Sequence, residues 1–115
     1  HDLQVAYVSH LSHISSFMLG KTVIEKSKNK TTILNLAGSG FESTVRLAKS
    51  SPDMWVPIFK QNRLNIIEIL SQYIDNLNRF KNLIEESKYE EIYDQMKSIN
   101  SIKTILDGII NSANK

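Results

Sequence analysis

The sequence contains no cysteine, which excludes disulfide bonds, zinc sites with thiolate ligands and cysteine nucleophiles. It also lacks an apolar run of the roughly 18 residues that would cross a bilayer, and it shows no signal-peptide pattern. The sequence also has no strong excess of charge of one sign, because 14 basic residues are interspersed with 12 acidic ones. A net charge of +2 is too small to predict a nucleic-acid-binding surface. We therefore expect a cytoplasmic protein that binds neither nucleic acid nor membrane.

The length of 115 residues and the hydrophobic content of 41% are those of one ordinary domain with a single core. The sequence begins at His1 rather than at a methionine, and this start falls inside a helical pattern. We therefore expect the chain to be part of a longer protein.

Apolar residues recur at steps of three and four along most of the chain, as is typical of amphipathic helices. This pattern predicts helices from Leu3 to about Lys26, from Ile58 to about Ile84, and from a Ser87 cap to about residue 110. The middle helix is the longest. Its apolar stripe is wider than a two-stranded coiled coil requires, so it should pack against several helices, with those of a second subunit among the candidates. An all-α fold follows.

The segment between residues 31 and 49 allows two interpretations. Residues 31–37, followed by Gly38-Ser39-Gly40, could form a strand that enters a phosphate-binding turn. Against this, Ser43 stands where the dinucleotide-binding fingerprint has its third glycine, and neither a second strand nor the expected acidic residue follows. The favoured interpretation is a helical turn, a glycine hinge and a short helix over about 41–49.

Ser51 and Pro52 predict the start of another helix, with a serine cap, proline at the first position and Asp53 in the first turn. Pro57 lies beyond the free amides of that first turn. We therefore expect a kink at Pro57, or a separate first turn that ends near Trp55.

Two of the three histidines, His10 and His13, lie three residues apart in the hydroxyl-rich stretch 9–16 of the first predicted helix. Side chains three apart share a helix face. Polar side chains on a mostly apolar helix need hydrogen-bond partners, so a lined pocket is one hypothesis. Histidines bonded to backbone in a core are the alternative. A metal cluster with His1 and Asp2 is weaker, because it needs a further histidine that the sequence lacks.

Several short motifs follow one another in a defined order. They are His1-Asp2, Ser9-His10-Leu11-Ser12-His13, Gly40-Phe41, Thr44-Val45-Arg46-Leu47-Ala48, and Met54-Trp55 followed by Asn62. In combination they resemble the C-terminal helical domain of prephenate dehydrogenases, and His13, Arg46 and Trp55 fall at that family's spacing. The resemblance extends over almost the whole chain.

The resemblance implies an all-α dimerisation domain of the 6-phosphogluconate dehydrogenase C-terminal-like type, with long helices intertwined in a homodimer. It also implies that residues 1–115 belong to an NAD-dependent enzyme of tyrosine biosynthesis that oxidatively decarboxylates prephenate to 4-hydroxyphenylpyruvate. The catalytic histidine and most of the NAD site would lie in an N-terminal domain, so this chain alone should be inactive. No metal is implied. An arogenate dehydrogenase and a non-catalytic helical module remain alternatives.

Site residues follow by matching positions to the family. Arg46 would bind a substrate carboxylate, for which a planar guanidinium is well suited. His13 would line the same pocket, with Ser9 one turn earlier on the same face. Trp55 would form a wall of the pocket, and Asp2 would come from the neighbouring subunit.

Three serines depart from the family pattern. Ser12 stands where a proline is usual between the histidines, and Ser39 interrupts the usual double glycine. Neither should matter much, because serine costs a helix little and Ser39 can still present its backbone amide to the substrate. Ser43 replaces a commonly acidic residue three positions before Arg46, so we expect an altered gate or local ion pair.

Overall fold

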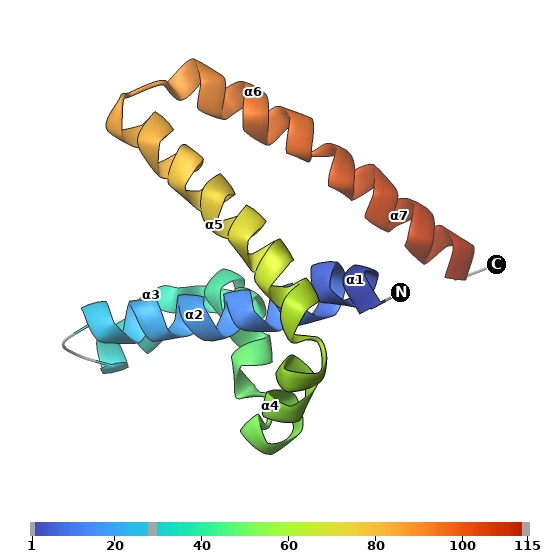
Figure 1. Cartoon of the computed structure of the whole chain (residues 1–115). Helices are drawn as coiled ribbons and strands as arrows, with labels where there is room; N and C mark the ends of the chain where they lie inside the picture. Colours follow the sequence, from blue (N-terminus) through green and yellow to red (C-terminus); the bar gives the residue numbers. More distant parts are fainter. Residues whose placement is uncertain (1, 28–29, 114–115) are drawn as a thin grey trace. The chain divides into compact units, whose positions relative to one another are not determined.

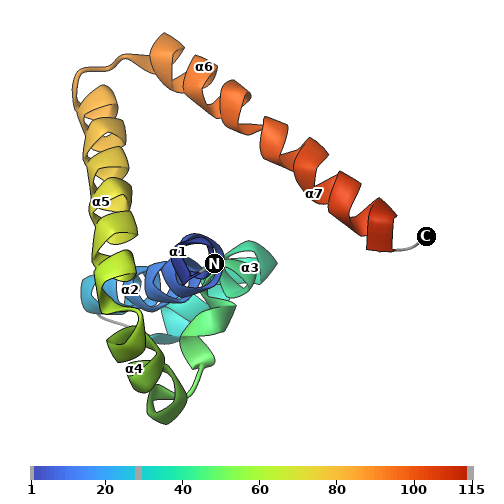
Figure 2. The same cartoon turned by 45° about the vertical axis from the view of Figure 1, so that its right-hand side comes forward.

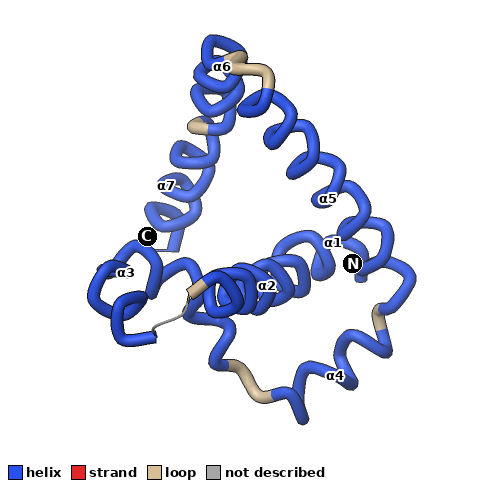
Figure 3. The backbone as a smooth tube through the Cα atoms, turned by 90° about the vertical axis from the view of Figure 1, so that its left-hand side faces the viewer, coloured by secondary structure: helices blue, strands red, loops and turns tan. Residues whose placement is uncertain are grey.

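The computed structural model describes residues 2–27 and 30–113, and every regular element in these two ranges is helical (Figure 1 and Figure 3). The predicted all-α fold is confirmed. Within the same ranges, no helix has the length and apolar character needed to cross a membrane. The chain divides into two units, His1–Gln72 and Tyr73–Lys115, and each is described by itself.

The first unit begins with one helical run made of α1 (Asp2–Val5), a π-helical turn η1 (Ala6–His10) and α2 (Leu11–Lys26). The predicted helix is confirmed, but the π turn was not foreseen. Its widened backbone is seen at Leu11, whose N–H bonds to the carbonyl of Ala6, five residues earlier. Short π-helical turns inside α-helices are rare and are often found at functional sites.

The helix α3 (Lys30–Val45) is interrupted at Gly38, which has φ 60° and ψ −172°. Only glycine adopts this backbone region without a large strain, so the predicted glycine hinge is confirmed. The strand alternative for 31–37 is wrong, since α3 covers that range. The helix expected over 41–49 tightens after Val45 into the 3-10 helix η2 (Arg46–Lys49). Figure 2 shows α2 and α3 in this unit, where both pack against each other and against η2.

The helix α4 (Pro52–Gln61) starts where the sequence predicts, with Asp53 in its first turn. Ser51 precedes it in extended conformation, but its side chain makes no capping hydrogen bond. The predicted first turn ending near Trp55 is wrong, because α4 continues through Pro57. Pro57 has no N–H to give to the carbonyl of Asp53, four residues earlier, but Asp53 is exposed, so the helix loses this hydrogen bond at a solvent-exposed residue.

The helix α5 (Arg63–Glu85) begins five residues later than predicted. Asn62 ends α4 with φ −114° and ψ 28°, outside the helical region, so Ile58 belongs to α4. Periodicity alone missed this break because apolar residues continue at helical spacing on both sides of it. The consequence is that α4 and α5 can follow different directions around Asn62.

In the second unit, α5 ends at a turn that the sequence assigned wrongly. Ser87 has φ 57°, its N–H bonds to the Ile84 carbonyl at 3.1 Å, and the N–H of Lys88 bonds to the Leu83 carbonyl at 2.9 Å. This pair of bonds is a Schellman motif with serine in the left-handed position that glycine usually occupies. Ser87 therefore closes α5, and Lys88 rather than Ser87 precedes the next helix.

The single last helix that the sequence predicts is two helices, α6 (Tyr89–Ile99) and α7 (Ser101–Ala113). They are separated at Asn100, whose carbonyl accepts a hydrogen bond from Lys103, three residues later. Asparagine and serine at this junction compete for backbone hydrogen bonds and weaken a helix. Glu90 and Glu91 occupy the first turn of α6, as expected.

The core of the described residues is small and lies in the first unit. Its buried apolar side chains are those of Ala6, Trp55 and Ile66, and its buried polar side chains are those of His10 and Ser16. Three of these five residues come from the helical run that contains the hydroxyl-rich stretch. The centre of this unit is therefore also the region that the sequence singles out as a site.

Candidate functional site

The ring of His13 stacks on the indole of Trp55, with centroids 3.6 Å apart and planes inclined by 26°. The His13 Nδ1 lies 2.8 Å from the carbonyl oxygen of Ser9. Because a carbonyl only accepts hydrogen bonds, Nδ1 carries the proton and Nε2 is the acceptor of the neutral ring. His13, Ser9 and Trp55 are thus brought together, and His13 is held by a face contact and by a backbone bond.

His10 meets the same indole edge-on, at a centroid distance of 5.8 Å and an interplanar angle of 86°. Its side chain is 8% exposed, and its Nδ1 accepts a hydrogen bond of 3.2 Å from Asn62 Nδ2. The Asn62 Oδ1 in turn accepts a hydrogen bond of 2.8 Å from Asn65 Nδ2. The bond from Asn65 decides which end of the Asn62 amide faces His10. Both histidines therefore contact Trp55, in different orientations and with different partners.

Arg46 lies on the element beside this group. It begins η2, and the residue two before it, Thr44, accepts a hydrogen bond of 2.8 Å through its carbonyl from Ser16 Oγ on α2. Ser16 is three residues after His13 on α2. The hydrogen bond from Ser16 to Thr44 therefore holds the chain just before Arg46 close to the stretch of α2 that carries His13. The guanidinium is exposed and forms no ion pair within residues 2–27 and 30–113. Among the described residues, no hydrogen bond or ring contact joins Arg46 to His13.

The other predicted positions lie apart from the stack. Ser39 is exposed and directly follows the Gly38 hinge. Asp2 opens α1, but its side chain lies outside the described part, as does the whole of His1. The Ser12 hydroxyl bonds back to the carbonyl of Val8 within its own helix. Across the described ranges, no three histidine or carboxylate side chains come close enough to hold a metal ion.

Sequence reasoning missed the π turn and the partner of Asn62. The two asparagines, Asn62 and Asn65, are three apart, a spacing that places side chains on one helix face. Their meeting with His10 depends on the chain break at Asn62, which helical periodicity does not reveal. A search for polar residues flanking a single buried tryptophan would have drawn attention to them.

A hollow of about 190 Å³ lies elsewhere in the first unit, lined by Tyr7, Glu68, Ile69 and Gln72. It contains none of the predicted site residues. Its one charged group is a carboxylate, which would repel an anionic ligand. The hollow is therefore a poor candidate for a site that recognises carboxylates.

The family model of the prephenate dehydrogenase dimerisation domain matches residues 1–98. The chain belongs to the prephenate dehydrogenase family. Among curated relatives, the cyclohexadienyl dehydrogenase of Zymomonas mobilis is 26% identical over 98 residues, which are 84% of this chain and 33% of the relative. The prephenate dehydrogenase of Bacillus subtilis is 25% identical over 109 residues, which are 95% of this chain and 29% of the relative.

Solved structures of the prephenate dehydrogenase family agree with this assignment. The prephenate dehydrogenase from A. aeolicus, in complex with hydroxyphenyl propionate and NAD+, superposes with a TM-score of 0.82 and 32% identity over 92% of this chain and 37% of that one. The Synechocystis arogenate dehydrogenase superposes with a TM-score of 0.81 and 25% identity over 90% of this chain and 38% of that one. The chain thus spans about a third of the length of these relatives. The predicted family resemblance is confirmed.

Proposed function

We propose that this chain is the dimerisation domain and the substrate-side wall of an NAD-dependent prephenate dehydrogenase of tyrosine biosynthesis. The observation that carries the proposal is the His13–Trp55 stack with Arg46 on the adjacent element, in a chain of this family. The ligand named for the A. aeolicus structure, hydroxyphenyl propionate, has a phenol ring and a carboxylate, as the expected product does. A site with an aromatic wall and a nearby arginine suits such a molecule.

In the proposed reaction, this chain binds and orients the substrate. Arg46 forms charge-assisted hydrogen bonds to one of the two carboxylates of prephenate. Trp55 and His13 form a flat wall for the six-membered ring, and His13 offers Nε2 as a hydrogen-bond acceptor. NAD, when bound, accepts the hydride, and loss of carbon dioxide completes the aromatic ring. The catalytic histidine and most of the NAD site belong to a separate N-terminal dinucleotide-binding domain.

Two further positions are assigned by their match to the family. Asp2 is proposed to reach the site of the neighbouring subunit, and Ser39 to present its backbone amide beside the glycine hinge. Ser39 is exposed, which suits this role. We further propose a cytoplasmic enzyme, with residues 1–115 as one domain.

The proposed homodimer is supported by apolar side chains on α6 and α7. Within the described part of the second unit no side chain is buried, and Tyr93 and Ile105 are 64% and 61% exposed. Exposed apolar side chains in such number on two successive helices are typical of sites of association. The exposed apolar residues on these two helices are Tyr89, Tyr93, Met96, Ile99, Ile102, Ile105, Leu106 and Ile109.

The test is turnover by the full-length protein. Prephenate with NAD should yield NADH, carbon dioxide and 4-hydroxyphenylpyruvate in equal amounts. The absence of turnover with both prephenate and arogenate, together with no heat of binding in calorimetry, would overturn the proposal and favour a helical interaction module.

Arogenate is the second candidate substrate. It is favoured by the likeness to the Synechocystis arogenate dehydrogenase, whose TM-score is nearly that of the A. aeolicus structure. Arogenate carries an amino group in place of the keto oxygen of prephenate, so both substrates present a carboxylate to Arg46. The ratio of kcat/KM for the two substrates decides between them.

A further inference from the structure

Three polar side chains that no proposed substrate contact uses meet beside Trp55. They are His10 in the π turn, Asn62 at the junction of α4 and α5, and Asn65 in the first turn of α5, and we call them the His10 network. Its bonds run in one direction, from the Asn65 amide to Asn62 Oδ1 and from Asn62 Nδ2 to His10 Nδ1. The neutral His10 ring therefore carries its proton on Nε2.

The His10 network lies in the least exposed part of the unit, where polar groups are costly. His10 and Trp55 are 8% and 6% exposed, and the other buried apolar residues among those described are Ala6 and Ile66. Burying a histidine demands that its ring nitrogens keep hydrogen-bond partners, and an aliphatic side chain would avoid that demand. A directional bond, however, fixes a ring in one rotation, which an aliphatic contact does not.

The ring contacts of Trp55 indicate what this fixed rotation does. Phe59 touches the indole at a centroid distance of 5.7 Å, but it belongs to α4, like Trp55 itself. The ring contacts that join the indole to the helical run of α1 and α2 come from His10 and His13. His10 meets the indole at nearly a right angle and His13 stacks on its face, so a rotation of the His10 ring would change one of the two histidine contacts of the indole.

We propose that the His10 network is a positioning device that sets the plane of Trp55 and, through the stack, the ring of His13. None of its three members touches the substrate in the proposed site. Its effect on substrate binding rests on the proposed function, whereas its effect on the Trp55 ring does not. His10, Asn62 and Asn65 are therefore positioning residues.

The test is fluorine NMR of the full-length protein labelled with 5-fluorotryptophan, in which Trp55→Phe identifies the Trp55 resonance. The unsubstituted protein should give one narrow Trp55 resonance. Asn62→Leu, which keeps the size of the side chain but removes its hydrogen bonds to His10 and Asn65, should shift and broaden it. The matched control is Gln61→Leu, which removes an amide from the exposed neighbouring position and should leave the resonance unchanged.

A rescue experiment separates hydrogen bonding from packing. His10→Leu removes the acceptor and should broaden the Trp55 resonance, whereas His10→Asn places an amide oxygen near the position of Nδ1 and should restore most of the narrow line. Asn65→Ala breaks only the outer bond of the network, so it should keep the fold and give a smaller shift. Broadening that is equal in His10→Leu and His10→Asn would overturn the proposal.

Kinetics supply the second measurement. With Trp55 and His13 misplaced, Asn62→Leu should lower kcat/KM for the substrate about tenfold, and Gln61→Leu should not. An unchanged Trp55 resonance in folded Asn62→Leu and Asn65→Ala proteins would overturn the network's role even in an active enzyme. Absence of dehydrogenase activity in the unsubstituted protein would overturn the proposed function and leave the NMR result standing.

Discussion

Ser16 and Thr44 are joined across 28 positions of sequence by a hydrogen bond of 2.8 Å from the Ser16 hydroxyl to the Thr44 carbonyl. This bond joins the end of α3, two residues before η2 begins, to α2 at a position three residues after His13. Ser16 is 5% exposed, so water cannot take the place of the Thr44 carbonyl as the partner of its hydroxyl. Together with the packing of η2 on α2, this bond helps to set the position of Arg46 relative to the His13–Trp55 stack.

Replacing Ser16 with alanine should therefore loosen η2. We expect Ser16→Ala to lower the free energy of unfolding by about 1 kcal/mol, as removal of one partly buried hydrogen bond does. It should also raise KM for prephenate in the full-length enzyme. Ser12→Ala is the matched control, since Ser12 is exposed and bonds only within its own helix. Urea unfolding and initial-rate kinetics on both variants check the prediction, and equal effects would contradict it.

Arg46→Ala should remove the proposed carboxylate contact. We expect KM for prephenate to rise by about 10- to 100-fold, since charge-assisted hydrogen bonds are worth roughly 1.5–3 kcal/mol. KM for NAD should change little, because the cofactor site is assigned to another domain. Lys49→Ala is the control, as it removes the other exposed cation of the same 3-10 helix. A KM for prephenate that stays unchanged would remove Arg46 from the site.

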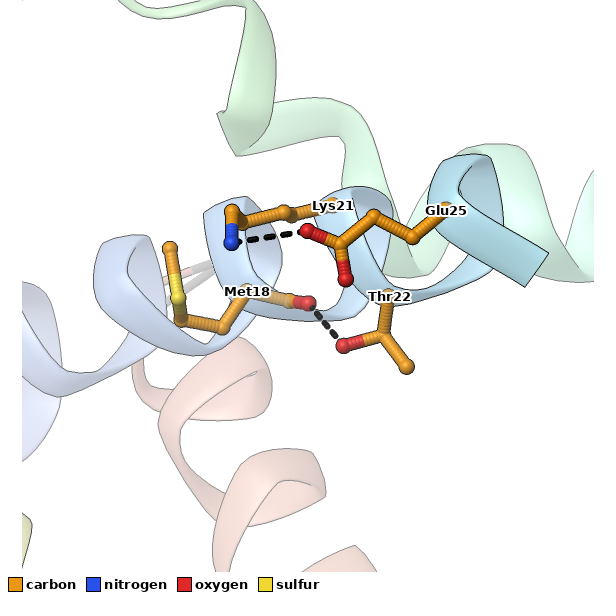
Figure 4. Close-up of polar contacts among 4 residues, drawn as sticks. All are labelled: Met18, Lys21, Thr22 and Glu25. Atoms are coloured by element: carbon orange, nitrogen blue, oxygen red, sulfur yellow. Dashed lines mark hydrogen bonds and ion pairs between the residues drawn. The ribbon is translucent and has the colours of Figure 1, made fainter.

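The ion pair between Lys21 and Glu25 gives a pH-dependent prediction. Lys21 Nζ lies 2.8 Å from a Glu25 carboxylate oxygen on the surface of α2 (Figure 4). The hydrogen bond that Lys21 donates to the Glu25 carboxylate, and then the charge of Glu25, raise the pKa of Lys21 above its ordinary value of 10.5. The folded state therefore holds this proton more tightly, and the small stabilisation is present below pH 10.5 and lost above it.

Glu25→Gln should return the pKa of Lys21 toward its ordinary value. NMR titration of the Lys21 side chain in both proteins measures the difference directly. Thr22 bonds to the Met18 carbonyl on the same surface (Figure 4), so Thr22→Ala changes a neighbouring polar contact without touching the ion pair. A Lys21 pKa that does not fall in Glu25→Gln would contradict the assignment.

Ser87 offers a stability prediction with a control of opposite sign. Its φ of 57° is unfavourable for a residue with a Cβ, by roughly 1–2 kcal/mol. Ser87→Gly should stabilise the protein by about 0.5–1 kcal/mol, the remainder being offset by the greater freedom of glycine in the unfolded chain. Ser98→Gly, inside α6, should destabilise it by about 0.5–1 kcal/mol. Denaturant unfolding of both variants provides the measurement.

The sequence predicted the helices wherever local chemistry was sufficient. The start of α4 follows from Pro52 and Asp53, and the hinge in α3 follows from Gly38, because each residue acts on its own backbone. The breaks at Asn62 and Asn100 could not be predicted, since the apolar periodicity continues across both. The sequence predicts Ser87 as a helix cap because serine is a common one, whereas its left-handed conformation closes the preceding helix.

The candidate site was predictable to a similar degree. The spacing of the family motif singles out His13 and Trp55, and Ser9 lies one turn before His13. In the structure, His13 stacks on Trp55 and its Nδ1 bonds to the backbone carbonyl of Ser9. The orientation of His10 was not predictable, because it depends on the π turn of its own helix and on the Asn62 amide from a distant one. Such long-range hydrogen bonds leave no period in the sequence.

The apolar surface of α6 and α7 leads to a prediction about assembly. Ile99 is 59% exposed at the end of α6, and a charge placed in an apolar interface is costly unless it is paired. In a symmetric dimer each substitution occurs twice. Ile99→Glu should therefore weaken self-association about 100-fold, which corresponds to roughly 2.7 kcal/mol.

The control for this surface is Lys97→Glu, which alters charge two residues away on a different face of α6. We expect this variant to sediment as the unsubstituted protein does, as a dimer at micromolar concentration. Ile99→Glu should shift the distribution toward monomer in the same experiment. A folded monomer in the unsubstituted protein would contradict the dimer, and it would leave the exposed apolar residues of α6 and α7 to be covered by another chain.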